Sequence, residues 1–385
     1  MVAALEQLDE VVTPALVVDR ERLLTNIQEM ADRARSLGVA LRPHAKTHKS
    51  PAIAALQREH GAVGLTVATI TEAEGFAADG VDDLVLTAPP VGDWRLERLL
   101  GLARRVRLRV VVDNVDVVAQ LKRACRRAGV ELGYLWEVDC GVGRFGTAPG
   151  AATAEQVAHV GSAPSHASFD GLLTFGGHAY AATSPDGILA AARDEHDALA
   201  QSAVALADRG IETAVRSVGS TPTSHFMESA DGITEIRPGN YVFYDATQVA
   251  LGVVGLERCA LSVLATVTSR PAPDRLILDS GSKALAAERL TTLTPGFGAV
   301  EGHPELRVER LYEEQAIVYS DGPCEIPVGA RVRVVPNHAC AAANLHSRML
   351  VVERGTVVDE WPVATRGWSE IDAERRPAWI QRTGP

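Results

Sequence analysis

The sequence has no apolar run of about 18 residues, the length that a transmembrane helix needs, so we expect no membrane-spanning segment. It also has no excess of positive charge, because 38 lysines and arginines stand against 49 aspartates and glutamates, a net charge of -11. An acidic chain repels nucleic acids and anionic membranes. We therefore expect neither of these as a partner.

Cysteine is scarce and unevenly spaced. The five residues are an odd number, which argues against a disulfide framework: Cys125, Cys140, Cys259, Cys324 and Cys340. The first residues also lack a basic stretch followed by an apolar one, so we expect no secretory signal. Together these absences predict a protein of the reducing cytoplasm.

Short apolar runs alternate with alanine-rich amphipathic segments over the first two-thirds of the chain. Strands separated by helices predict an α/β fold, a closed, TIM-like (β/α)8 barrel. An open doubly wound sheet is the alternative, because periodicity does not distinguish the two. The eight predicted strands lie at residues 39–43, 64–68, 83–88, 107–113, 132–139, 170–175, 213–218 and 234–237.

The pattern changes after about residue 245. Short strands are predicted at 263–267, 276–279, 332–335 and 350–352, with turn signals between them and no long helical pattern. This pattern is typical of a mostly antiparallel β domain. We expect residues 14–245 to form the barrel and residues 1–13 with 246–385 to form the β domain.

A basic segment follows the first predicted strand. Residues 42–49 read Arg-Pro-His-Ala-Lys-Thr-His-Lys, so five basic or titratable side chains lie within eight positions. Nearby cations disfavour the protonated form of an amine, which makes Lys46 a candidate Schiff-base nucleophile. That chemistry suggests a carbonyl cofactor, with pyridoxal phosphate as the leading candidate. A solvated basic face is the alternative.

Polar loops follow several later strands, where a barrel carries its catalytic groups. Residues 141–146 have the spacing G-x-G-x-x-G, but no acidic residue ends a following strand about 20 residues on, as a dinucleotide site needs. We expect instead a tight loop that directs Arg144 into the barrel mouth, with a surface turn as the alternative. After the sixth strand, His178 is a candidate acid or base, with a structural histidine as the alternative.

The loops after strands seven and eight have the composition of a phosphate site. Residues 217–221 and 238–241 are rich in small residues that expose backbone N–H groups, and hydroxyls such as that of Ser220 add donors. Barrels commonly bind phosphate in these two loops. Either segment alone could be only a turn.

A possible metal site follows the strand predicted at 331–335. If the chain stays extended there, residues two apart point to one side, so His338 and Cys340 could bind one ion. A thiolate with an imidazole favours zinc over magnesium or manganese, and two protein ligands leave room for water and substrate, as in a catalytic site. The alternative is a small buried cysteine beside an ordinary histidine.

Taken together, these motifs resemble the D-threonine aldolase and D-serine dehydratase family, fold-type III pyridoxal phosphate enzymes related in barrel architecture to alanine racemase. The resemblance implies a homodimeric lyase that needs pyridoxal phosphate and a divalent metal and acts on D-3-hydroxy amino acids. It runs along nearly the whole chain, through residues 13–19, 42–49, 137–144, 237–241, 271–279 and 336–340.

The resemblance also implies roles for the matching residues. Lys46 would bind the cofactor as a Schiff base, and Arg144 would face its pyridine ring. The phosphate would be held with help from Thr221, Gly239 and Asn240.

The resemblance also implies residues that lie near the pyridine ring of the cofactor and residues that bind the metal. His178 and Tyr180 would lie near the ring. His338 and Cys340 would bind the metal that contacts the substrate's β-hydroxyl, with zinc favoured and manganese and magnesium as alternatives.

One residue bears on the reaction. In the resemblance, dehydratases carry His-x-Cys and well-known aldolases carry His-x-Asp, so Cys340 favours a D-serine or D-3-hydroxyaspartate type dehydratase, an ammonia-lyase. The alternative is a D-threonine aldolase, which yields glycine and an aldehyde, because length and flanking motifs are at least as aldolase-like. An amino-acid racemase, which needs no metal, and a non-catalytic cofactor carrier, which would resemble the barrel alone, are further alternatives.

Overall fold

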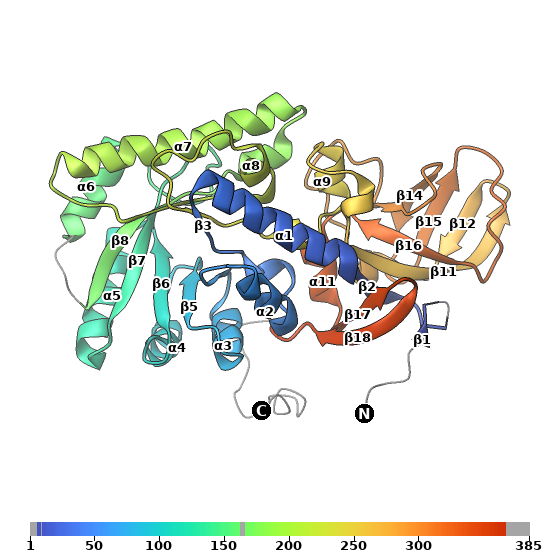
Figure 1. The fold of residues 1–385 in the computed structure, drawn as a ribbon, viewed down its shortest axis with the longest axis horizontal. Helices are drawn as coiled ribbons and strands as arrows, with labels where there is room; N and C mark the ends of the chain where they lie inside the picture. Colours follow the sequence, from blue (N-terminus) through green and yellow to red (C-terminus); the bar gives the residue numbers. More distant parts are fainter. Residues whose placement is uncertain (1–5, 9, 162–165, 367–385) are drawn as a thin grey trace. The chain divides into compact units, whose positions relative to one another are not determined.

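The computed structural model describes residues 6–8, 10–161 and 166–366. By its contacts the chain divides into two compact units (Figure 1). The β unit comprises Met1–Asp32, Ala179–Ile188 and Gly239–Val363, and the barrel unit comprises Arg33–His178, Leu189–Pro238 and Ala364–Pro385. The predicted domain ranges, 14–245 and 1–13 with 246–385, stay a prediction, and their ends at 1–5 and 367–385 lie outside the described residues.

The barrel unit is built on eight parallel strands in the order β3-β10-β9-β8-β7-β6-β5-β4. A bridge between His44 and Thr66 joins the two ends of this order, and the Thr66 N–H donates to the Pro43 carbonyl at 2.8 Å. The sheet is therefore closed, which confirms the predicted (β/α)8 barrel and excludes the open doubly wound sheet. The strands are Ala40–Leu41 (β3), Leu65–Val67 (β4), Asp83–Leu86 (β5), Arg107–Val112 (β6), Leu132–Glu137 (β7), Ala167–Leu173 (β8), Val215–Val218 (β9) and Glu235–Ile236 (β10).

Helices follow most of the barrel strands. Two of them contribute residues to both units, α1 (Arg20–Leu37) and α7 (Pro185–Ala207). The others are Pro51–Glu59 (α2), Ile70–Ala78 (α3), Asp93–Ala103 (α4), Val115–Ala128 (α5), Ala151–Val160 (α6) and Thr221–Phe226 (α8).

Helix α5 shows how the sequence sets these elements. The Asn114 side chain accepts from the Asp116 N–H at 2.8 Å and caps the helix, and Gly129, with φ of 61°, ends it in the left-handed conformation that glycine adopts without strain. Its buried face repeats at helical spacing through Val118, Leu121 and Cys125.

The barrel interior has an apolar core formed by successive strands. Val85, Val111, Leu135 and Leu173, one each from β5 to β8, pack together and are almost fully buried. Every residue of β7 is buried, as expected of a strand covered on both faces.

The β unit contains a ten-stranded, mostly antiparallel sheet, as predicted. Six of its strands close on themselves in the order β11-β12-β15-β14-β13-β16, because β16 pairs back with β11. The strands are Glu6–Gln7 (β1), Ala15–Asp19 (β2), Leu261–Ala272 (β11), Arg275–Leu278 (β12), Gly298–Val300 (β13), Leu306–Leu311 (β14), Ala316–Ser320 (β15), Arg331–Pro336 (β16), Arg348–Glu353 (β17) and Thr356–Pro362 (β18). Three short helices lie among them: Ala246–Ala250 (α9), Ser282–Leu285 (α10) and Ala339–Leu345 (α11).

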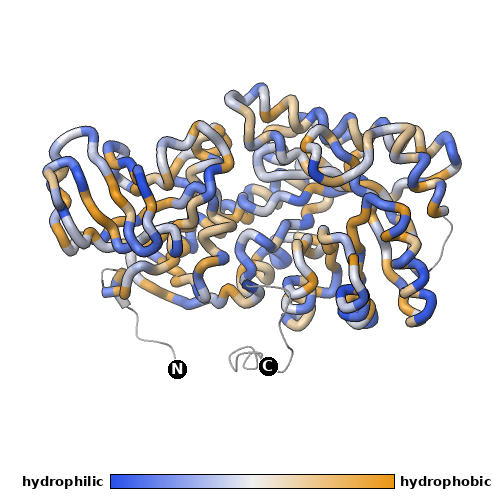
Figure 2. The backbone as a smooth tube through the Cα atoms, turned by 180° about the vertical axis from the view of Figure 1, so that it is seen from behind, coloured by the Kyte–Doolittle hydropathy of each residue, from blue (hydrophilic) through white to orange (hydrophobic). Residues whose placement is uncertain are grey.

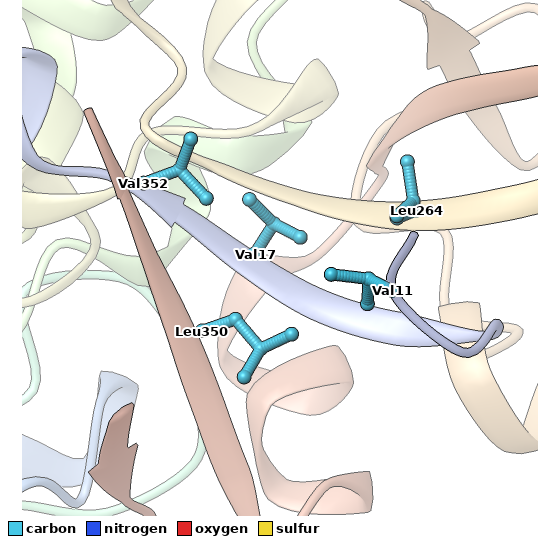
Figure 3. Packing of buried hydrophobic residues seen from close by; sticks show 5 residues of the cluster. All are labelled: Val11, Val17, Leu264, Leu350 and Val352. Carbon is cyan, nitrogen blue, oxygen red and sulfur yellow. The ribbon is translucent and has the colours of Figure 1, made fainter. Parts of the chain in front are cut away.

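The β unit has its own apolar core. Val17 on β2 pairs with strands on both sides, antiparallel to β11 and parallel to β17. Figure 3 shows its side chain among those of Val11, Leu264, Leu350 and Val352, which form one buried cluster.

Apolar residues occur in short stretches in both units, interrupted by polar ones (Figure 2). Within the described ranges, no helix combines the length and the apolar character needed to cross a membrane. None of the five cysteines, all of which lie in the described ranges, forms a disulfide bond.

Candidate functional site

A cavity of about 270 Å³ in the barrel unit is lined by Lys46. The other polar side chains on its wall include Arg144, Arg237 and Glu137, and Phe175 provides an aromatic surface 5.7 Å from the lysine Nζ. These residues follow or end different strands, as expected for a barrel site. The cavity thus brings a lysine amine, two guanidinium groups and one carboxyl group together.

The basic segment around Lys46 does not form the crowded cationic cluster that its sequence suggests. Arg42 is buried, and its Nε and Nη1 donate to Glu235 at 2.6 Å and to Asp83 at 2.7 Å. Lys49 pairs with buried Glu72 at 3.4 Å. The cations that share the cavity with Lys46 come instead from other strands of the barrel.

Both histidines of this segment are buried. Burial, together with the charges of Lys46 and Arg237, lowers the pKa of His44 well below its usual range. Burial also lowers the pKa of His48 to about 4. Both rings are therefore neutral near pH 7. The Nδ1 atom of His44 accepts from the Lys46 backbone N–H at 3.5 Å, which helps to shape the short turn that carries the lysine.

A tight loop after β7 presents Arg144. Asp139 accepts from the backbone N–H groups of residues 141, 142 and 143 at 2.9 to 3.1 Å. Partial burial tends to raise the pKa of Asp139, but these hydrogen bonds stabilise the carboxylate and lower the pKa overall. Gly146 has φ of 101°, and a Cβ there would lie 2.6 Å from the Asp139 nitrogen. The loop holds the Arg144 guanidinium 5.1 Å from the centre of the Phe175 ring.

Of the acidic, lysine and arginine residues that line the cavity, Glu137 and Arg237 were not predicted as site residues. Burial raises the pKa of Glu137 to about 6, although Arg237 and Arg144 oppose the shift. The Nε atom of Arg237 donates to Ser217 at 2.8 Å, and the Ser217 hydroxyl donates to Glu235 at 2.7 Å. Both residues stand in motifs quoted above, Glu137 at the start of 137–144 and Arg237 at the start of 237–241. Their positions at the ends of predicted strands could have identified them as candidate site residues.

The remaining predicted residues of the barrel unit lie in the loops after β8 and β9. His178 Nε2 lies 3.1 Å from Asp194 Oδ2. Ser220 is buried and caps α8, because its hydroxyl accepts from the Thr223 N–H at 3.3 Å. Thr221 is the first residue of α8 and is also buried. Among the described residues that line the cavity of Lys46, Phe175 comes from the loop after β8, but His178, Ser220 and Thr221 do not line it.

Glu195 of α7 connects these two loops. Its Oε1 accepts from the Gly176 N–H at 2.5 Å and from the Gly219 N–H at 3.0 Å. The carboxyl group is fully buried, and burial raises its pKa. Glu195 was not predicted, because it lies within a long amphipathic helix with no motif around it.

The other predicted cofactor residues, Tyr180, Gly239 and Asn240, belong to the β unit. Tyr180 is half-buried in a short 3-10 turn. Gly239 precedes another such turn, which begins at Asn240. The Asn240 Nδ2 donates to Asp245 at 2.6 Å and lies 4.0 Å from the Cys340 Sγ.

The predicted metal ligands lie where β16 gives way to α11. The expectation that the chain stays extended through Cys340 is wrong, because His338 caps a helix that begins at Ala339 and Cys340 lies in its first turn. The alanine-rich sequence after His338 favours a helix. The two side chains nevertheless meet, since His338 forms a hydrogen bond with Cys340.

The surroundings of this pair are acidic. Glu288 forms a hydrogen bond with His338 Nδ1, and Asp245 is fully buried nearby. Burial alone would lower the pKa of His338, but the charge of Cys340 and hydrogen bonds to Cys340 and Glu288 raise it to about 11. Burial raises the pKa of Asp245. Neither acid was predicted, because neither lies within the motif 336–340.

The donor set fits a catalytic rather than a structural metal. Within the described ranges, no three histidine, cysteine, aspartate or glutamate side chains lie close enough to hold a metal by themselves. A thiol and an imidazole suit zinc and leave positions for water or substrate. The buried Oδ1 of Asn240 has no hydrogen-bond partner among the described residues, so the cluster also contains a polar atom that another group could satisfy.

Two family models match the chain. The N-terminal domain of alanine racemase matches residues 18–247, and a putative serine dehydratase domain matches residues 260–352. A D-threonine aldolase from Arthrobacter sp is 34% identical over 368 residues, which cover 94% of this chain and 95% of the aldolase. The D-threo-3-hydroxyaspartate dehydratase of Delftia sp. (strain HT23) is 38% identical over 348 residues, which cover 86% of this chain and 91% of the dehydratase.

Solved structures are similar over almost the whole chain. The structure of the Delftia dehydratase superposes with a TM-score of 0.87 and covers 94% of this chain and 100% of its own. Its solved mutants include one with alanine for a histidine and another, metal-free, with alanine for a cysteine two positions later. An alanine racemase from Clostridium difficile 630 superposes with a TM-score of 0.67 at 14% identity and covers 92% of this chain and 99% of its own, which supports the fold alone.

Proposed function

Because the chain belongs to the family of D-threonine aldolases, 3-hydroxyaspartate dehydratases and D-serine dehydratases and is a pyridoxal phosphate-dependent lyase, we propose that it dehydrates D-serine or D-3-hydroxyaspartate type substrates with the help of a divalent metal. The observation that carries this proposal is the contact between His338 and Cys340, a soft donor pair on one turn of chain. We further propose that the protein is a homodimer in the cytoplasm, because the described cysteines form no disulfide bond, as is usual in a reducing compartment.

Pyridoxal phosphate fits the cavity of the barrel unit. When bound, it supplies an electron sink for negative charge at the substrate Cα. In our proposal Lys46 would hold the cofactor covalently, and Arg144, whose guanidinium group lies over the Phe175 ring, would face the cofactor ring. Arg237 adds a fixed positive charge on the same wall. Thr221, Gly239 and Asn240 help to bind the phosphate, as the family resemblance implies, and the hydroxyl group of Ser220 in the same loop is a further donor in our proposal.

His178 is the proposed acid or base, and Tyr180 completes the surroundings of the ring. Asp194 engages the Nε2 atom of His178 at 3.1 Å, which orients the imidazole. The Nδ1 atom of the same ring is buried and has no hydrogen-bond partner within the described ranges. That nitrogen is the one free to hold or move a proton.

A zinc ion fits His338 and Cys340, with manganese and magnesium as alternatives. When bound, the metal supplies Lewis-acid polarisation of a hydroxyl group. The histidine and cysteine replaced in the solved mutants of the Delftia dehydratase have the same two-residue spacing, and its cysteine mutant is described as metal-free. This spacing supports a dehydratase rather than a racemase or a cofactor carrier.

The second candidate is a D-threonine aldolase. The similarity to the Arthrobacter aldolase covers 94% of this chain, more than the 86% covered by the similarity to the dehydratase. Both reactions need a cofactor lysine and a metal, so the residue types favour the dehydratase only through Cys340.

Product analysis separates the two candidates. The cofactor-loaded protein is given D-serine, D-threonine or D-3-hydroxyaspartate, with zinc or with a chelator. A keto acid and ammonia, lost on chelation and restored by zinc, are the expected products. Glycine and an aldehyde would establish an aldolase and refute the argument from Cys340.

A further inference from the structure

The backbone on both sides of His338 is held by residues that begin helix α9. We propose that Asp245 and Thr247, here called the clamp, are positioning residues that fix His338 and Cys340 for one metal ion. This inference rests on the proposed metal site and adds two residues that the motif 336–340 does not contain.

Asp245 holds the segment after His338. It is fully buried, and its Oδ2 accepts from the Ala339 N–H at 2.9 Å. Its Oδ1 accepts from the Gln248 N–H at 3.1 Å and so caps α9. A buried carboxylate that accepts several N–H groups is fixed in orientation, and it in turn fixes the first residue of α11.

Thr247 holds the segment before His338. Its hydroxyl donates to the Asn337 carbonyl at 2.7 Å, and its backbone N–H lies 3.4 Å from the same oxygen. Thr247 is fully buried. The carbonyl before His338 and the N–H after it are therefore both bonded to one short turn of chain.

Asp245 also orients the residue beside the thiol. Its Oδ2 accepts from Asn240 Nδ2 at 2.6 Å, and the same amide nitrogen lies 4.0 Å from Cys340 Sγ. An N–H group near a metal thiolate stabilises its charge, and such supporting groups commonly change metal affinity. One carboxylate thus supports both the backbone of the ligand segment and an amide at the ligand itself.

A merely structural role for the clamp makes a different prediction. As a helix cap alone, Asp245 would affect the free energy of unfolding and leave metal affinity unchanged. As a positioning residue, it changes the affinity and the electronic environment of the metal. Asp279 offers a matched control, because it lies in the same unit and accepts from the Thr266 N–H at 2.7 Å and the Thr13 hydroxyl at 2.5 Å.

The test measures zinc affinity of the cofactor-loaded full chain by competition with a chromophoric chelator. The variants are Asp245→Asn, Thr247→Val and the control Asp279→Asn, with His338→Ala as the reference for a lost ligand. We expect zinc binding to weaken about 10- to 100-fold in Asp245→Asn, as for other supporting residues, and less in Thr247→Val. The thiolate-to-metal absorption of the cobalt-substituted protein should shift in Asp245→Asn and stay unchanged in Asp279→Asn.

The outcomes separate the two proposals. If His338→Ala binds zinc as the natural protein does, the metal site itself is refuted. If His338→Ala loses zinc while Asp245→Asn and Thr247→Val bind it within twofold of the natural protein, only the clamp is refuted. An equal loss in Asp279→Asn also refutes the clamp. If Asp245→Asn fails to fold, the zinc affinity of Thr247→Val decides whether the clamp is supported or refuted.

Discussion

The barrel unit gathers its cavity from residues far apart in the sequence, whereas the β unit places its candidate metal ligands two residues apart on one turn. Lys46 shares its cavity with Arg144 and Arg237, which follow other strands. His338 and Cys340 meet because the chain changes from strand to helix between them. A dispersed site depends on the closure of the barrel, and a local site depends on the few hydrogen bonds that hold its turn.

The largest expected effect comes from the centre of the dispersed site. Replacing Lys46 with alanine removes the amine that would hold the cofactor, so the visible absorbance of bound pyridoxal phosphate should vanish. Turnover should fall by more than about 10³-fold, as when other covalent catalysts are removed. Absorbance spectra and product assays measure both. The matched control is Lys49→Ala, which removes the nearby lysine that pairs with Glu72, and equal losses in the two variants would contradict the assignment.

A smaller effect is expected from the ion pairs of buried Arg42 in the barrel unit. Glu235→Gln leaves buried Arg42 with Asp83 as its remaining carboxylate and weakens the link through Ser217 to Arg237. Breaking a buried pair costs about 3–5 kcal/mol of unfolding free energy, measurable by urea denaturation. In the β unit, Glu360→Gln breaks an exposed pair with Arg348 and should cost less than about 1 kcal/mol. A similar loss of unfolding free energy in Glu235→Gln and Glu360→Gln would contradict the expected difference between the buried and the exposed ion pair.

The smallest effect concerns pH. Burial raises the pKa of Glu137 to about 6 from 4.5, so the folded protein binds more protons than the unfolded chain between these values. Unfolding free energy should therefore fall as the pH rises through this window, by about 2 kcal/mol at most. Glu137→Gln should remove this decrease in urea titrations at pH 4 and 7. If the unfolding free energies of the natural protein and of Glu137→Gln differed by the same amount at pH 4 and pH 7, the raised pKa of Glu137 would be refuted.

Much of the fold could be predicted because local patterns determine it. All eight barrel strands overlap the predicted ranges, since buried parallel strands are mostly apolar runs between amphipathic helices. Lys46 stands out because it directly follows a strand. The closed barrel was predicted, but periodicity could not exclude an open sheet, because closure depends on contacts such as the bridge between His44 and Thr66 that no periodicity records.

The site was less predictable where partners are distant in the sequence. The basic segment suggested that four other basic or titratable side chains crowd Lys46, but Arg42 is paired with Glu235, 193 positions later. Glu195 and Asp245 matter because they are buried and accept backbone N–H groups, and a sequence does not show which acids are buried. The helix at Cys340 was missed because the strand signal before it was extended too far.

The most direct test measures zinc content and cofactor absorbance side by side in Lys46→Ala and Cys340→Ala. If the barrel unit holds the cofactor and the β unit holds the metal, Lys46→Ala loses the absorbance and keeps its zinc, and Cys340→Ala loses zinc and keeps the absorbance. A Cys340→Ala protein with the natural zinc content, or a Lys46→Ala protein with intact absorbance, would contradict the assignment of the two sites.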